Sequence, residues 1–230
     1  MPILDGTIAL ITGAKGGLGT SVTRAFLDAG AQVIGVSRSI QAADFPHPAF
    51  TALPANLADP AAVNAMVADA IDRFGRIDAL VHVAGGFAGG KSLAETDDAT
   101  LEQMLDLNLR SAFYITRALV PHLRRQGGGR IVAVASRQAV DPMPGTGAYN
   151  ISKAALVSLV RTLALENKDR GITANTVLPG TMDTPGNRAG GGDSSGWVDP
   201  AQVAALLVHL ASTQAAQISG AAIPIYGRQL

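Results

Sequence analysis

Short apolar runs alternate along the chain with longer segments in which apolar residues recur at helical spacing. The runs are nearly continuous in apolar residues, as strands are when helices cover both of their faces. "TIALIT", residues 7–12, is the first and stops at a glycine cluster. We expect strands at 7–12, 31–36, 50–55, 77–85, 128–136, 171–180 and 221–226.

The segments between these runs carry the end signals of helices. Asp59-Pro60 and Asp199-Pro200 each place an aspartate N-cap before a first-turn proline, and Gly30 stands where a C-cap is expected. Residues 181–197 are rich in glycine and polar side chains and are expected to form a mobile loop. The expected helices span 18–29, 60–74, about 98–125, 148–167 and 200–212.

Strands that alternate with helices of this length predict right-handed βαβ units and a parallel sheet. No linker or change of composition divides the chain. We therefore expect residues 1–230 to form a single doubly wound Rossmann-type α/β domain, with a seven-stranded parallel sheet and helices on both faces. In such sheets ligands bind beyond the carboxyl ends of the strands.

Composition excludes several kinds of function. Eighteen basic residues balance eighteen acidic ones without a basic block, which argues against a nucleic-acid partner. The chain has no cysteine, so disulfides, thiolate metal sites and thiol catalysis are excluded, and its four histidines never fall at metal-ligand spacing. The amino terminus shows no cleavage signature or membrane-spanning run, so a soluble, cytoplasmic protein with no membrane partner is expected.

The segment "TGAKGGLG" follows the first strand and opens the first helix. Gly13, Gly17 and Gly19 would allow a tight turn, close approach of a pyrophosphate and close packing of helix on strand. The strand–turn–helix context favours dinucleotide binding over an ordinary glycine turn.

The second strand ends at Ser37-Arg38, where an acidic residue would hold the ribose hydroxyls of NAD. A hydroxyl and a guanidinium suit a 2′-phosphate instead, and Lys15 would add to their charge. We expect NADP(H), with NAD possible. The alternative is that Arg38 is a solvated surface residue.

Ser136 precedes Tyr149 by thirteen residues, and Lys153 follows Tyr149 by four. The tyrosine and the lysine would share one helix face, and the proline- and glycine-rich segment before them could fold the serine back to meet them. A tyrosine can protonate a developing alkoxide, and a nearby cation favours its phenolate. The alternative is an ordinary surface pair on a helix.

With these motifs the sequence resembles the short-chain dehydrogenase/reductase family over nearly its whole length. "TGAKGGLG", "YNISK" with Ser136, Asn108 in "DLNLRSAF", and "LPGTMDTP" each match a family motif. The resemblance implies a small carbonyl or alcohol substrate and a homodimer or homotetramer. It implies the catalytic set Asn108, Ser136, Tyr149 and Lys153. It implies cofactor contacts at Gly13, Lys15, Gly17, Leu18, Gly19, Ser37, Arg38, Asn56, Leu57, Ala84, Gly85, Tyr149, Lys153, Pro179, Gly180 and Thr181.

The resemblance also implies roles. Ser136 would donate to the substrate oxygen, and Lys153 would hydrogen-bond the nicotinamide ribose. Asn108 would hold a backbone carbonyl and a water that links the lysine to solvent; alternatively, it is a buried polar residue of its helix.

The chain departs from the family pattern in ways that leave alternatives open. His82-Val83-Ala84-Gly85 replaces Asn-Asn-Ala-Gly, Asn56 stands where aspartate is frequent, and the 182–197 loop is short. "VAGGFAGG", "LPGTMDTPGNR", Trp197 and the ending Gly-Arg-x-Leu resemble the dihydropteridine reductase branch, which lacks the serine and uses NADH. A cofactor-binding sensor without turnover is a third possibility.

Four further residues have two interpretations each. His82 is either a satisfied core histidine, which we favour, or a base. Arg137 meets either an anionic substrate or solvent. Arg188 and Trp197 either close over a planar ligand or belong to a flexible lid with one anchoring aromatic.

Overall fold

A parallel sheet runs through the centre of the protein. The computed structural model describes residues 1–228, so Leu230, the end of the Gly-Arg-x-Leu motif, lies outside it. Within this range seven strands pair in the order β3-β2-β1-β4-β5-β6-β7, and every neighbouring pair is parallel. The strands are β1 (Ile8–Thr12), β2 (Gln32–Ser37), β3 (Phe50–Pro54), β4 (Ala79–His82), β5 (Gly129–Val134), β6 (Ile172–Pro179) and β7 (Ala222–Ile225).

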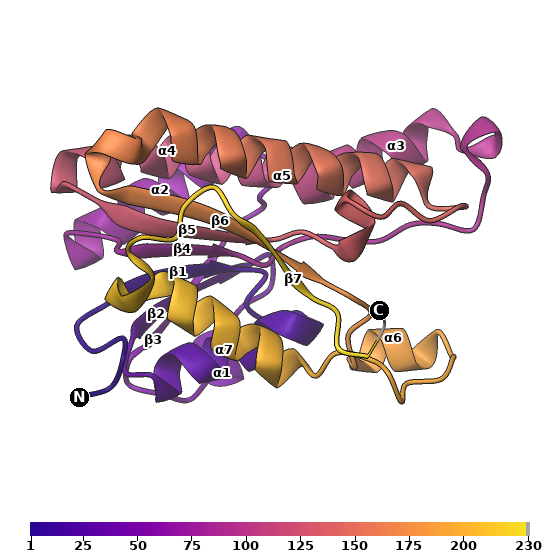
Figure 1. Ribbon diagram of the computed structural model, residues 1–230. Coiled ribbons are helices and arrows are strands. Elements are labelled where there is room, and N and C mark those ends of the chain that lie inside the picture. Colours follow the sequence, from indigo (N-terminus) through magenta and orange to yellow (C-terminus); the bar gives the residue numbers. More distant parts are fainter. Residues whose placement is uncertain (229–230) are drawn as a thin grey trace.

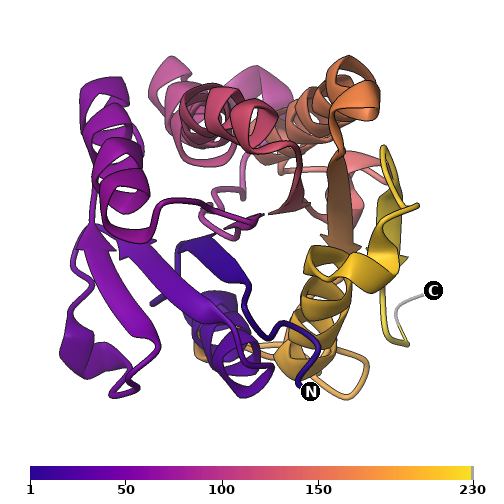
Figure 2. The ribbon, with the colours of Figure 1, turned by 90° about the vertical axis from the view of Figure 1, so that its left-hand side faces the viewer.

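Helices cover both faces of this sheet (Figure 1). α1 (Gly17–Asp28) and α7 (Pro200–Ala211) pack on one face, and α2 (Pro60–Phe74), α4 (Ser111–Gln126) and α5 (Gly147–Asn167) on the other, as the view along the sheet in Figure 2 also shows. Each face has its own apolar cluster. Successive residues of β1 alternate between the two: Leu10 belongs to one and Ile11 to the other. The predicted fold class is confirmed.

The residues that were expected to cap the helices do so in the structure. The Asp59 side chain accepts from Ala61 N at 2.9 Å, and the Asp199 side chain accepts from Ala201 N at 2.8 Å. Gly30 follows α1 with a φ of +89°, which places it in the left-handed region that favours glycine.

The helix expected over 98–125 is not one regular helix. It consists of α3 (Asp98–Leu105), a π-helical segment η3 (Asp106–Arg110) and α4. A π-turn holds one more residue than an α-turn, so it changes the direction of the side chains that follow. Asn108 lies within η3 and is fully buried, so the π-helical segment positions one of the predicted site residues.

Other short elements lie outside the expected ones. The 181–197 segment contains α6 (Pro185–Ala189), capped by Thr184, and a bridge between Met182 and Val198 ties its two ends together. The remaining segments are single turns of 3₁₀-helix: η1 (Ala42–Asp44), η2 (Leu93–Glu95), η4 (Arg137–Ala139), η5 (Lys168–Arg170) and η6 (Thr213–Ala215).

The strand order places a switch point between β1 and β4. From β1 the chain builds outward through β2 and β3 on one side, and from β4 to β7 on the other. A ligand crevice is expected at the carboxyl ends of β1 and β4. None of the helices in residues 1–228 is long and apolar enough to cross a membrane, and no three potential metal ligands of this range come together.

Candidate active site

The turn after β1 leaves no room for side chains at two of its glycines. Gly13 N donates to Val36 O at 2.8 Å, and Gly13 has a φ of +69°. A Cβ on Gly13 would lie 2.7 Å from Ala84 N, and a Cβ on Gly19 would lie 1.9 Å from Gly13 O. Glycine is therefore required at both positions for the turn to pack between α1 and the end of β4.

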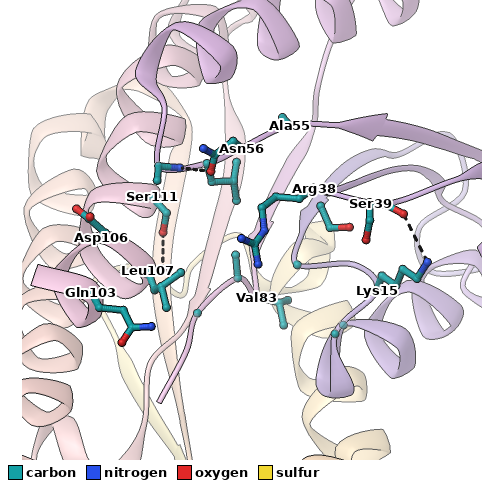
Figure 3. A pocket seen from close by; sticks show the side chains of 18 of the residues that line it. Lys15, Arg38, Ser39, Ala55, Asn56, Val83, Gln103, Asp106, Leu107 and Ser111 are labelled. Atoms are coloured by element: carbon teal, nitrogen blue, oxygen red, sulfur yellow. Dashed lines mark hydrogen bonds between the residues drawn. The ribbon is translucent and has the colours of Figure 1, made fainter. Parts of the chain in front are cut away.

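Two adjoining cavities extend from this turn across the carboxyl ends of the strands. The first, of about 1030 Å³, is shown in Figure 3, and the second encloses about 790 Å³. The second shares Gly17, Leu18, Val83 and Gly85 with the first, so the two form one continuous cleft. The first is lined by the expected cofactor residues Gly13, Lys15, Gly17, Leu18, Gly19, Ser37, Arg38, Asn56, Leu57, Ala84 and Gly85, and the second by Ser136, Tyr149, Lys153, Pro179, Gly180 and Thr181.

The first cavity offers polar groups at the end of β2. The Arg38 side chain reaches into the cavity in Figure 3. The buried Ser37 Oγ has no hydrogen-bond partner within the described part of the chain. Lys15 is engaged elsewhere, since Nζ lies 2.8 Å from the Asp44 carboxylate. The glycine turn and these polar groups fit the pyrophosphate and the adenosine ribose of a dinucleotide.

Tyr149 and Ser136 meet at the other end of the cleft. Burial raises the pKa of the Tyr149 phenol, and a hydrogen bond with the Ser136 side chain opposes this rise. Ser136 follows β5 and caps η4, where its Oγ also accepts from Gln138 N at 3.2 Å. The loop between them thus folds as the sequence predicted. With its pKa above the ordinary value, Tyr149 holds its proton at neutral pH.

Lys153 lies beneath Tyr149 and is only 5% exposed. Its Nζ donates to Val134 O at 3.0 Å and is 5.9 Å from the centroid of the Tyr149 ring. Burial lowers the pKa of Lys153 to about 8. The sequence led us to expect this cation to lower the pKa of the tyrosine. The structure differs, because burial governs the phenol and the ammonium is directed to a carbonyl.

Asn108 lies behind the cleft and does not line either cavity. Its Nδ2 donates to Gly86 O and to Ser152 Oγ, both at 3.0 Å, and Gly86 N donates to Oδ1 at 2.9 Å. A Cβ on Gly85 would lie 2.7 Å from this Oδ1. Asn108 therefore holds the backbone that follows β4 against η3 and α5.

His82 is a buried core histidine in this structure. Its Nδ1 lies 2.9 Å from Thr12 Oγ1, and Nε2 lies 3.4 Å from Ser111 Oγ. Burial, with a smaller contribution from the charge of Lys153, lowers the pKa of His82 to about 3. The neutral ring links β4 to β1 and to α4, in agreement with the interpretation that we favoured.

Two cleft residues were missed by the sequence analysis. Thr184 is buried and lines the second cavity, and a Cβ on Gly17 would lie 3.3 Å from Thr184 Cβ, so the 181–197 segment rests on the glycine turn. Thr184 stands four residues after Gly180 and just before a proline, and this sequence position could have indicated a helix cap near the cleft. Phe87 packs edge-on against Tyr149 with 5.1 Å between ring centroids. Nothing in the sequence spacing indicated this contact.

Three charged or aromatic residues with open interpretations are now placed. Arg137 lines the second cavity and pairs with Asp141 at 2.8 Å. Arg188 forms an ion pair with Asp183. Neither Arg188 nor Trp197 lines the cleft, so in this conformation they do not cover a ligand there.

Comparisons with known proteins agree with this geometry. The profile of the short chain dehydrogenase family matches residues 7–192. The chain is 32% identical over 255 aligned residues to 3beta-hydroxysteroid dehydrogenase 2 of Eggerthella lenta, covering 98% of this chain and 95% of that protein. It is 28% identical to a 3-oxoacyl-[acyl-carrier-protein] reductase of Vibrio cholerae, covering 97% of each.

A solved structure extends the likeness to the whole fold. The crystal structure of 3-ketoacyl-(acyl-carrier-protein) reductase from Brucella melitensis, complexed with NADH, superposes with a TM-score of 0.89 at 29% identity and covers 99% of this chain and 100% of that one. The family profile, the relatives and the cleft at the switch point lead to one conclusion. The chain belongs to the short-chain dehydrogenase/reductase family and is an NAD(P)-dependent oxidoreductase with a Rossmann-type fold.

Proposed function

We propose that this enzyme interconverts a small carbonyl compound and its alcohol, with NADP(H) as its preferred cofactor and Tyr149 as acid and base. The observation that carries the proposal is that Ser136, Tyr149 and Lys153 together line one end of a cleft whose other end is the glycine turn. This arrangement would place a substrate oxygen beside two hydroxyl groups, one of which is a proton donor at neutral pH.

Each residue has a defined task in this scheme. A bound nicotinamide cofactor supplies or accepts the hydride. In reduction, the Tyr149 hydroxyl gives its proton to the developing alkoxide while Ser136 donates a hydrogen bond to the same oxygen. In oxidation, the Tyr149 phenolate takes the proton from the alcohol. Lys153 would orient the ribose and favour that phenolate once its ammonium turns from Val134 O.

The preference for NADP(H) rests on Ser37 and Arg38. Both line the first cavity, and the orphaned Ser37 Oγ together with the Arg38 guanidinium would take a phosphate dianion as a charge-assisted hydrogen-bond acceptor. Lys15 contributes less than the sequence suggested because Asp44 neutralises it. No acidic residue stands at the end of β2 to hold a ribose diol in its place.

We further propose that the protein acts in the cytoplasm as a homodimer or homotetramer. Exposed apolar side chains on α4 and α5, among them Phe113 and Leu165, support the assembly. Ser136 in contact with Tyr149 supports carbonyl chemistry over that of a pterin reductase lacking the serine, and over a sensor without turnover.

NADPH oxidation with a panel of ketones and with a quinonoid dihydropterin, in the wild type and in Ser136→Ala, tests the proposal. We expect turnover of ketones that falls at least about tenfold without the serine. Rapid pterin turnover that survives Ser136→Ala would replace the proposal with a pterin reductase. Tight NADPH binding without oxidation of any compound in the panel would favour a sensor.

A further inference from the structure

The substrate end of the cleft has an apolar rim. Phe87 and Met143 both line the second cavity, and they are 64% and 57% exposed. Exposed large apolar side chains that line one cavity are typical of a ligand-binding groove. Here they flank the position where the reacting carbonyl is proposed to lie.

Phe87 is placed by the active site itself. Its ring meets Tyr149 at an interplanar angle of 71°, an edge-to-face contact. A Cβ on Gly89 would lie 3.0 Å from the tip of the Phe87 ring, so the glycine leaves room for the ring in this position. The ring therefore packs edge-on against Tyr149 and leaves much of its surface exposed.

Met143 is anchored by its backbone and leaves its side chain exposed. Its carbonyl accepts from Thr146 Oγ1 and from Asn150 Nδ2, both at 2.9 Å. Asn150 is the residue after Tyr149, so Met143 is tied to the helix that carries the tyrosine. The thioether is adaptable and can follow apolar groups of several shapes.

The charges that line this part of the cleft are compensated or buried. Arg137 donates to Asp141 at 2.8 Å, and its guanidinium also lies 5.1 Å from the centroid of the Tyr226 ring. Lys153 is buried beneath the tyrosine. Asp141 lines the same cavity, offsets the charge of Arg137 and would repel a substrate carboxylate, so the lining favours a neutral ligand.

We propose that the substrate is a neutral carbonyl compound whose carbonyl carbon bears an apolar group, and that this group packs on Phe87 and Met143. The inference rests on the proposed carbonyl chemistry and adds the class of substrate. Burying one methylene group changes affinity by about fourfold, so an alkyl chain that lengthens over this rim gains affinity at each step.

The test measures kcat/KM with NADPH for unbranched methyl ketones from 2-butanone to 2-octanone, and Kd for the matched, non-reducible primary amides by calorimetry with NADPH present. For the wild type we expect a gain of about two- to fourfold per methylene over the first steps in both series. Phe87→Ala should reduce the gain per methylene to below about 1.5-fold, mainly through an increase in KM. Phe87→Leu should restore most of the gain. Val140→Ala is the control, because Val140 is exposed on the same loop as Met143 but does not line the cleft.

The two readouts separate this inference from the proposed function. Ketone turnover without chain-length dependence in either series, or an equal loss in Val140→Ala, would overturn the apolar rim and leave the carbonyl chemistry standing. An amide affinity that rises with chain length and depends on Phe87, without any ketone turnover, would support the apolar rim and contradict the carbonyl chemistry. Preference for a keto acid over the ketone of equal length would overturn the neutral substrate.

Discussion

Asn108 and Gly86 exchange a pair of hydrogen bonds: Nδ2 donates to the glycine carbonyl at 3.0 Å, and the glycine N–H donates to Oδ1 at 2.9 Å. The two residues lie on different segments, η3 and the chain that leaves β4. Because Gly85 lines both cavities and Gly86 the second, this pair fixes the backbone at the centre of the cleft. The π-turn presents Asn108 to that backbone.

Replacing Asn108 by alanine should therefore destabilise the protein and loosen the cleft. The substitution removes the partner of the part-buried Gly86 N–H and carbonyl and one partner of the buried Ser152 hydroxyl, and an unpaired polar group costs up to about 1–3 kcal/mol when it is buried. We expect the free energy of unfolding, measured with urea, to fall by about 2–4 kcal/mol and NADPH affinity to fall with it. Asn64→Ala, at an exposed position of α2, is the matched control and should change the free energy of unfolding by less than about 0.5 kcal/mol. Equal free energies of unfolding for the two variants would show that the hydrogen bonds between Asn108 and Gly86 do not stabilise the protein.

Arg38→Asp should reverse the cofactor preference. A charge-assisted hydrogen bond contributes about 1.5–3 kcal/mol, so its loss and the added repulsion should lower the affinity for NADPH relative to NADH by about ten- to a hundredfold. Fluorescence titration with each cofactor measures the ratio. Lys15→Ala should change it less, because Asp44 already neutralises that lysine. An unchanged ratio in Arg38→Asp would remove Arg38 from the cofactor site.

His82 should make stability fall in acid. Burial lowers its pKa from 6.5 to about 3, so the unfolded chain binds a proton between these values that the folded protein excludes. As pH falls below 6.5, proton uptake by His82 in the unfolded chain should lower the unfolding free energy by about 1.4 kcal/mol per pH unit. His82→Asn should lose that contribution. Urea unfolding at pH 6.5, 5.5 and 4.5 gives both slopes, and parallel slopes would show that the imidazole accepts a proton in the folded state.

Self-association should depend on the outer faces of α4 and α5. Leu165 is 66% exposed on α5, and a charge placed there would be buried without a partner in a helix-paired interface. We expect Leu165→Glu to shift the protein toward smaller species in sedimentation velocity. Leu93→Glu, equally exposed on η2, should leave the distribution unchanged. A wild type that sediments as a monomer at micromolar concentration would contradict the proposed assembly.

The fold was predictable because its signals are local. Apolar runs such as 7–12 and caps such as Asp59-Pro60 depend on neighbours in the sequence, and the structure follows them. The spacing of Ser136, Tyr149 and Lys153 likewise indicated that they would meet.

What could not be predicted depends on contacts between distant segments. The π-turn at 106–110 accompanies the bonds of Asn108 to Gly86 and Ser152, which no periodicity reveals. The charge on Lys15 is engaged by Asp44, and the ring of Phe87 reaches Tyr149, for the same reason. The pKa of Tyr149 departs from the expectation because burial is a property of the fold and not of the spacing.

Single-turnover reduction by Tyr149→Phe tests the central claim most directly. The variant keeps the aromatic ring that packs on Phe87 and removes only the hydroxyl that meets Ser136. With saturating NADPH and a ketone that the wild type reduces, we predict a hydride-transfer rate at least about a thousandfold lower and a Kd for NADPH within about twofold of wild type. A reduction rate within tenfold of wild type would show that another group supplies the proton.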